Sequence, residues 1–163
     1  AIFKIAMDWS NNVNTAIENI SAEENKPFEN VISTLKTMRK EADVIVVSSV
    51  TKDAIETEWK KVGLIDYVDA VFTQEFGSKT ESISFVQKQG DYKNEHVLKV
   101  GDSPGDLKAA QDNHVFFYPI IANQEEKSWI ELRDVYFGKF IAEEFTGVQE
   151  ELIDKFFNEL KEN

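Results

Sequence analysis

The protein is an acidic chain of 163 residues that contains no cysteine. Its 42% hydrophobic and 12% aromatic content is enough for one compact domain with a buried core. The net charge of −12 argues against a surface that binds nucleic acid or an anionic membrane. The lack of cysteine excludes disulfides, thiolate nucleophiles and cysteine-ligated metals, so a reducing cytoplasm is the expected location.

The composition also limits membrane and metal chemistry. No apolar run approaches the roughly 20 residues of a membrane-spanning helix, and the N-terminus lacks the pattern of a signal peptide. His96 and His114 are the only histidines, so a metal would have to be bound mainly by carboxylates. Carboxylate ligands favour a hard cation such as Mg²⁺.

The first segment, residues 1–21, has apolar residues three or four positions apart and predicts an amphipathic helix. The polar residues 22–26, followed by Pro27, predict a break in the chain. We therefore expect two parts, a helix over residues 1–22 and a main domain over residues 27–163.

Short runs of β-branched and aromatic residues predict strands in the main domain, at 44–48, 69–73, 97–101 and 115–121. The segments between these runs have helical patterns and are long enough to connect parallel strands. Helices are expected at 28–38, from Thr51 to Gly63, and after Thr80, Ser103, Ser128 and Gly147. The sequence thus predicts an α/β fold, a Rossmann-like parallel sheet with helices on both faces.

The most specific segment is VGDSPGD at residues 100–106, an apolar strand followed by an acid, a tight turn and a second acid. The strand would place Asp102 at the carboxyl edge of the sheet, where open α/β sheets bind ligands. A carboxylate at this edge can hold a cation. Asp106 has two interpretations, because with Ser103 it also forms a good helix-capping arrangement.

GDSPGD after a strand resembles the fourth motif, GDxxxD, of the haloacid dehalogenase-like hydrolase superfamily. Two further motifs occur in the family's order. Residues 44–48 (VIVVS) resemble the second motif, an apolar strand that ends in Ser or Thr, and Lys79 in GSKT resembles the third-motif lysine. The match covers about residues 27–121. Most members of the superfamily are magnesium-dependent phosphatases, which is the activity that the resemblance implies.

The resemblance assigns a role to each matching residue. Ser48 would donate a hydrogen bond to phosphate, Lys79 would pair with phosphate and the nucleophile, and Asp102 would ligate Mg²⁺. Asp106, the second acid of the motif, is counted with the catalytic residues. Ser49 is a second candidate for substrate binding, and Ser48 is preferred because it directly ends the apolar run. A hydroxyl, an ammonium group and a metal suit a phosphoryl group, whose transfer requires its oxygens to be positioned and neutralised.

The family's first motif, DxDxT, supplies the nucleophilic aspartate and the central strand. Asp8 is the nearest candidate, but Ser10 and Asn12 occupy the positions of the second acid and the threonine, and the helical stripe continues through Asp8. Residues 1–21 instead resemble the closing helix of a cap inserted between the first and second motifs. We therefore expect the chain to be part of a longer protein, with the first-motif strand and the nucleophile outside the given sequence.

These observations predict a magnesium-dependent hydrolase of a small phosphorylated metabolite that acts through an aspartyl-phosphate. The paired acids Asp102 and Asp106 disfavour a dehalogenase, which uses no cation. The alternative is a non-catalytic phosphate-binding or interaction domain of the same fold. A receiver-like signalling domain is disfavoured because its acid pair should lie on the first strand. The substrate and the oligomeric state are not predicted.

Overall fold

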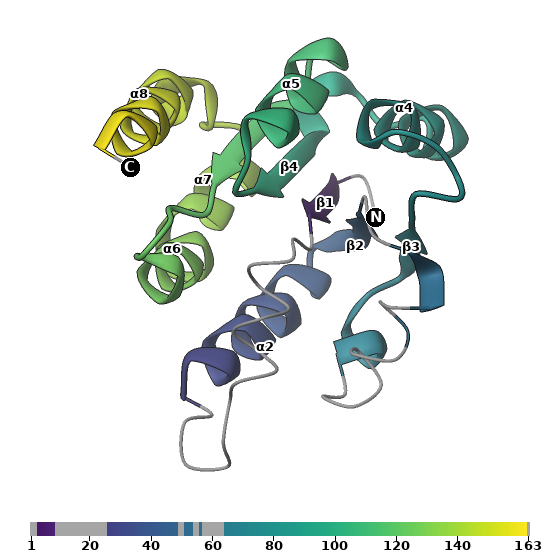
Figure 1. Cartoon of the computed structure of the whole chain (residues 1–163), viewed down its shortest axis with the longest axis horizontal. Helices are drawn as coiled ribbons and strands as arrows, with labels where there is room; N and C mark the ends of the chain where they lie inside the picture. Colours follow the sequence, from purple (N-terminus) through teal and green to yellow (C-terminus); the bar gives the residue numbers. More distant parts are fainter. Residues whose placement is uncertain (1–2, 9–25, 49–50, 54–55, 57–63, 163) are drawn as a thin grey trace.

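The computed structural model describes residues 3–8, 26–48, 51–53, 56 and 64–162 (Figure 1). A parallel sheet of five strands forms its centre, in the order β3-β2-β1-β4-β5. The strands are β1 (Phe3–Asp8), β2 (Ala42–Val47), β3 (Ala70–Phe72), β4 (Val97–Gly101) and β5 (Phe116–Pro119). The predicted α/β fold with a parallel sheet is confirmed.

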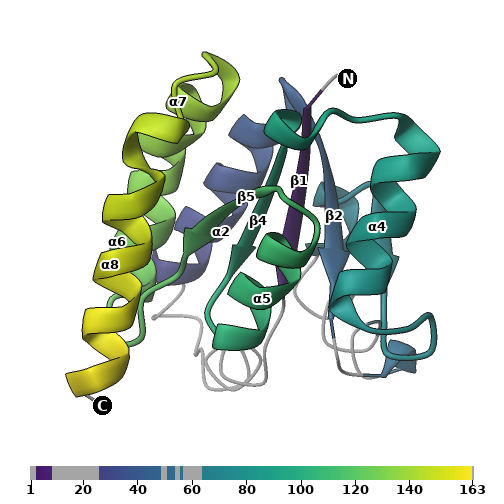
Figure 2. The same cartoon turned by 90° about the horizontal axis from the view of Figure 1, so that it is seen from above.

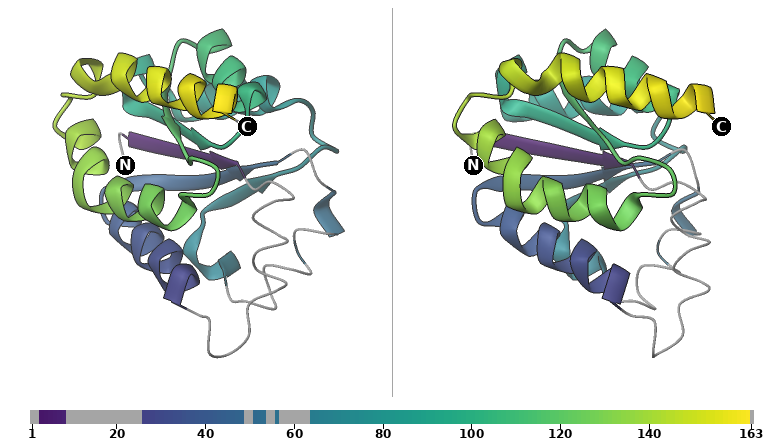
Figure 3. Two further views of the ribbon diagram at one scale, coloured as in Figure 1. Left: turned by 60° about the vertical axis from the view of Figure 1, so that its left-hand side comes forward. Right: turned by 90° about the vertical axis from the view of Figure 1, so that its left-hand side faces the viewer.

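Helices cover both faces of this sheet (Figure 3). One face carries α2 (Lys26–Arg39), α6 (Glu125–Glu131), the π-helical turn η3 (Leu132–Tyr136) and α7 (Phe137–Ile141). The other face carries α4 (Lys79–Gly90) and α5 (Pro104–Asp112). Two short 3-10 helices, η1 (Leu64–Tyr67) and η2 (Asn94–His96), precede β3 and β4. None of the described helices combines the length and the apolar character needed to cross a bilayer.

The last helix, α8 (Thr146–Glu162), lies along the edge strand β5. The side-chain amide of Gln149 bonds to both backbone groups of Phe117. The Phe117 N–H donates to Gln149 Oε1, and Gln149 Nε2 donates to the Phe117 carbonyl, each at 2.7 Å. Phe156 of α8 packs against the ring of Phe117. The edge of the sheet at β5 is therefore covered by a helix.

The helix predicted over residues 1–21 is wrong for residues 3–8, which form the central strand β1. This strand pairs in parallel with β2 on one side and β4 on the other. Ile5 and Met7 are buried in the core beneath α2, while Ala6 is buried on the opposite face. A strand that is buried on both faces does not need to alternate polar and apolar residues. The spacing of the apolar residues in β1 is therefore also compatible with a helix, which is why the sequence predicted one.

The expectation that the central strand lies outside the given sequence is wrong, because β1 fills that position. The remainder of the predicted N-terminal helix lies in residues 9–25, outside the described residues. Residues 3–8 of the predicted segment 1–22 belong to the same sheet as the segment 27–163, and the rest of this division stays a prediction. The helix predicted from Thr51 to Gly63 also lies mostly outside the described part of the chain.

In the part of the chain that the structure describes, serine side chains cap two helices, one of them as predicted. Ser103 caps α5. Ser78, rather than Thr80, caps α4, because Glu81 lies three residues after Ser78 and completes a capping box with it. Ser128 lies inside α6 instead of at its start. These differences shift helix starts by a few residues and leave the order of the elements unchanged.

The burial of β1 predicts a large effect of truncating Ile5, which is fully buried. Ile5→Ala should lower the free energy of unfolding by about 2–5 kcal/mol, because it leaves a cavity in the core. Phe157 on α8 is the control, since it is 43% exposed and Phe157→Ala should cost about 1 kcal/mol or less. Urea unfolding followed by circular dichroism measures both variants. Equal, small losses would contradict a central position for β1.

Candidate active site

The carboxyl ends of β2, β1 and β4 lie side by side at one edge of the sheet (Figure 2). Asp8, the last residue of β1, is opposite Val47 at the end of β2. Ser48 follows β2 directly, and Asp102 follows β4. Neighbouring strands lie about 4.8 Å apart, so the backbones at Ser48 and Asp102 are separated by about 10 Å across β1. The topology therefore gathers these three residues at one edge.

Ser48 is anchored to the neighbouring strand. Its backbone N–H donates to the carbonyl of Phe72 at 2.8 Å, which extends the pairing of β2 with β3. The residue is buried. Ser49, the other candidate hydroxyl, lies outside the described residues. The structure thus places Ser48 at the carboxyl edge, and the roles of both serines stay predictions.

Lys79 and Asp106, both predicted site residues, are brought into contact. Lys79 is the first residue of α4, and its Nζ lies 2.9 Å from Asp106 Oδ1. The Asp106 side chain is fully buried, whereas the Lys79 side chain is 18% exposed. Asp106 therefore orients the lysine and leaves part of its side chain accessible from outside.

The second oxygen of Asp106 organises the turn after β4. Asp106 Oδ2 accepts hydrogen bonds from the backbone N–H groups of Asp102 and Ser103, both at 3.1 Å, and from the Ser103 hydroxyl at 2.9 Å. The capping interpretation of Asp106 is thus confirmed, and its catalytic role stays a prediction. One oxygen completes the cap of α5, and the other binds Lys79.

Lys99 is a part of this arrangement that the sequence analysis missed. It lies in β4, fully buried, with its Nζ 3.2 Å from Asp106 Oδ1 and 3.2 Å from the carbonyl of Val100. The signal in the sequence is a single charged residue within the apolar strand VLKVG. A charge in a strand that is covered on both faces needs a buried partner. Asp106 is that partner.

Gly101 allows Asp106 to lie against the end of β4. A Cβ atom at position 101 would stand 2.4 Å from Asp106 Cγ and 2.4 Å from its Oδ2. No side chain fits there unless Asp106 moves. The glycine before Asp102 is therefore required by the packing of the buried carboxylate.

Thr73 and Glu75 connect the loops that follow β3 and β2. The Thr73 hydroxyl donates to the Glu75 carboxylate, whose two oxygens also lie 3.2 Å from the backbone nitrogen of Lys52. The hydrogen bond from Thr73 is the main cause that lowers the pKa of the Glu75 carboxyl below its usual value. The sequence analysis did not identify this connection, which links the two loops at the carboxyl edge.

Among the described residues, Asp8 ends β1 and Asp102 follows β4, so two acidic residues lie at the carboxyl ends of adjacent central strands. Asp102 is half-buried beyond β4. Both oxygens of Asp106 accept hydrogen bonds from protein donors, and the metal-ligand role of Asp102 stays a prediction. Among the described residues, no group of three or more acidic or histidine side chains is arranged to hold a metal. Mg²⁺ needs only one or two carboxylates, because water and phosphate oxygens supply the remaining ligands.

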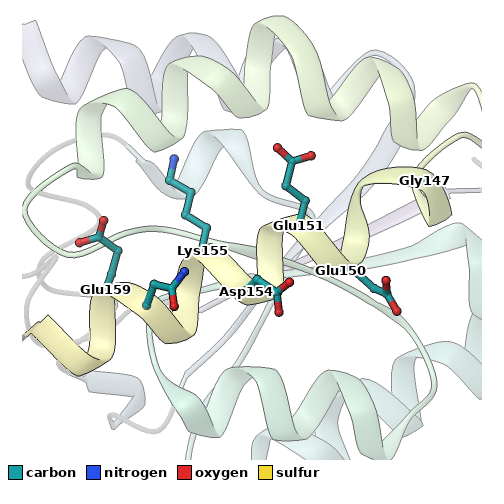
Figure 4. Close-up of a pocket in the computed structure, with 7 residues that line it drawn as sticks. Gly147, Glu150, Glu151, Asp154, Lys155 and Glu159 are labelled. Atoms are coloured by element: carbon teal, nitrogen blue, oxygen red, sulfur yellow. The ribbon is translucent and has the colours of Figure 1, made fainter.

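A second feature of the surface is a hollow along α8, at a distance in the sequence from these residues (Figure 4). It is lined by Gly147, Glu150, Glu151, Asp154, Lys155, Asn158 and Glu159. All of these side chains come from one helix, and carboxylates outnumber the single lysine. An acidic surface of this kind repels anions. The carboxyl edge of the sheet is therefore the better candidate for an anionic ligand.

Comparisons with known proteins match the part of the chain that forms the sheet. A family model described as haloacid dehalogenase-like hydrolase matches residues 3–120. Among curated proteins, no match was found. A solved structure of a HAD-superfamily hydrolase from Geobacter sulfurreducens has 14% identity and a TM-score of 0.57, with 73% of this chain and 89% of that chain covered.

Two further solved structures share the fold. The core domain of a protein provisionally named phosphoglycolate phosphatase, from Streptococcus pneumoniae, has 14% identity and a TM-score of 0.53, covering 73% of this chain and 80% of that chain. A protein provisionally named beta-phosphoglucomutase, from Thermotoga maritima, has 13% identity and a TM-score of 0.54, covering 72% of this chain and 84% of that chain. At such identities the likeness establishes the fold.

The contact between Gly101 and Asp106 leads to a prediction about stability. Gly101→Ala should lower the free energy of unfolding by about 1–3 kcal/mol, because the added methyl group overlaps the carboxylate. Gly138 in α7 is the matched control, since a Cβ there meets no atom within 4 Å. Gly138→Ala should be neutral or stabilise by roughly 0.5–1 kcal/mol. If urea unfolding gives the two variants equal stability, Asp106 does not pack on Gly101 as described.

Proposed function

Since the chain belongs to the haloacid dehalogenase-like hydrolase family, we propose that it is a magnesium-dependent phosphatase of a small phosphorylated metabolite, acting through an aspartyl-phosphate. The observation that carries this proposal is the buried Asp106, which binds both Lys79 and the turn of Asp102 at the edge where β1 ends. Two structural neighbours carry the names of enzymes that act on small phosphorylated molecules, which supports the substrate class.

We assign the nucleophile to Asp8. In the family the nucleophilic aspartate ends the central strand, and Asp8 is the last residue of β1, which is the central strand here. A carboxylate oxygen of Asp8 would attack phosphorus as the bond to the leaving alcohol breaks, and water would then release inorganic phosphate. Lys79 would pair with the phosphate oxygens, and Ser48 or Ser49 would donate a hydrogen bond to them.

Magnesium would be held by Asp102 and Asp8, which follow or end adjacent strands. When bound, the ion would neutralise the charge of the phosphoryl oxygens. The protein fixes Asp102 through its backbone, because the Asp102 N–H donates to the buried Asp106. The chain as a whole carries a net charge of −12 and repels anions at long range. Phosphate would therefore be recognised by the local positive charge at this edge.

The proposed metal site is tested with Asp102→Asn. This variant should lower magnesium-dependent hydrolysis about 100-fold or more, because it removes a carboxylate ligand while keeping the shape of the side chain. Its melting temperature should stay near that of the wild type, because the backbone N–H that binds Asp106 remains. Phosphate release from a panel of sugar phosphates and nucleotides, with Mg²⁺ or with EDTA, measures the effect.

Asp112→Asn is the matched control for this experiment. It removes the same charge from an exposed residue of α5 that pairs with Lys108, and activity should not change. An unchanged rate in Asp102→Asn would overturn the metal assignment.

The assignment of the nucleophile is tested by trapping the intermediate. Wild-type protein mixed with a substrate that carries radiolabelled phosphate, and then quenched in acid, should retain covalent label. Asp8→Asn should retain none, because an amide does not form the acyl phosphate. Label in Asp8→Asn would place the nucleophile elsewhere. Binding of phosphate by the wild type with no turnover on any substrate would instead favour the non-catalytic phosphate-binding alternative.

A further inference from the structure

The buried carboxylate of Asp106 has two lysines on one oxygen. Lys79 Nζ lies 2.9 Å and Lys99 Nζ lies 3.2 Å from Asp106 Oδ1. The two lysines come from different elements, α4 and β4. Because two ammonium groups face one carboxylate, these three side chains together carry one net positive charge. They lie at the carboxyl edge, directly beneath the turn that contains Asp102.

Lys99 is not needed to satisfy Asp106. Without it, Asp106 Oδ1 would still accept from Lys79, and Oδ2 would still accept from two backbone N–H groups and the Ser103 hydroxyl. The other residues of β4 before Gly101 that flank Lys99 are apolar and buried. Burying a charge costs free energy, and an apolar side chain of similar volume is often neutral or stabilising in its place. The contact of Lys99 with Asp106 is therefore no evidence that the lysine stabilises the strand.

We propose that Lys99 is a positioning residue that adds positive charge to the phosphate site. This inference rests on the proposed function. Lys99 adds a second positive charge beside the ion pair of Lys79 and Asp106, at an edge that also holds the acidic residues Asp8 and Asp102. A phosphoryl dianion that approaches the partly exposed Lys79 is thus attracted more strongly than it would be without Lys99.

The burial of these groups makes the effect of Lys99 substantial. Charges in the interior interact through a lower effective dielectric constant than charges in water, so the field of Lys99 is less screened. The two ammonium groups on Asp106 Oδ1 also repel each other in the ligand-free protein. An anion bound beside Lys79 offsets part of that repulsion. Both effects raise the affinity for anions, although it is Lys79 and not Lys99 that contacts the anion directly.

The test compares Lys99→Met with Lys108→Met on the full chain, using inorganic phosphate as the probe in the presence of Mg²⁺. Methionine keeps the length and the volume of the lysine and removes its charge. Lys108 on α5 is the matched control, because the same charge is lost from a side chain that is 75% exposed. Isothermal titration calorimetry measures the affinity for phosphate, and thermal unfolding measures stability.

Lys99→Met should bind phosphate about tenfold more weakly, which corresponds to about 1.4 kcal/mol, and Lys108→Met should bind like the wild type. The melting temperature of Lys99→Met should be equal to that of the wild type or higher, because the variant no longer buries a charge. For an active substrate, KM should rise by about the same factor while kcat changes little, because the charge acts on bound substrate and transition state alike.

Each of the other outcomes contradicts the inference, and the measurements show for which reason. Wild-type affinity in folded Lys99→Met would refute it and leave the phosphatase proposal standing. A Lys99→Met protein that melts much earlier, fails to fold or mainly loses kcat would show that Lys99 has a structural role. A wild-type protein that does not bind phosphate would overturn the proposed function and this inference with it.

Discussion

The carboxyl edge depends on the buried carboxylate of Asp106. Its two oxygens bind groups from three elements: α4 through Lys79, β4 through Lys99, and the turn before α5 through Asp102 and Ser103. A buried carboxylate is costly unless it is paired, so the hydrogen bonds from α4 and from the turn before α5 stabilise Asp106 in this position. The Asp106 carboxylate thus couples the start of α5, the conformation of the turn that contains Asp102, and the position of the Lys79 ammonium group.

The central strand gives this edge its second constraint. β1 is paired on both sides and buried on both faces, so the position of its last residue, Asp8, is set by the whole sheet. Helix α4 brings Lys79 to the same edge from the sequence after β3. The protein is acidic overall, yet two lysines face Asp106 at this edge. A small anion would therefore be recognised by contact at the edge rather than by long-range attraction.

The sequence was sufficient to predict the parts of the fold that have clear local signals. Strands β2 to β5 are bounded by polar residues, and the cap of α5 at Ser103 follows a known pattern, so both were found. β1 was missed because a short apolar strand covered on both faces lacks alternation. Lys99 was missed because a single lysine in an apolar run predicts no particular site unless its buried partner is known. That partner, Asp106, was identified from its own motif.

The contact between α8 and β5 has a consequence for assembly. Parallel strands at the edge of a sheet present outward-facing peptide groups, which can recruit a strand from another molecule. Here the amide of Gln149 imitates a neighbouring peptide and occupies both groups of Phe117. Helix α8 thus prevents another strand from pairing with β5 at Phe117. Without α8, the peptide groups of β5 would be exposed, and strands of neighbouring molecules would pair with them and cause aggregation.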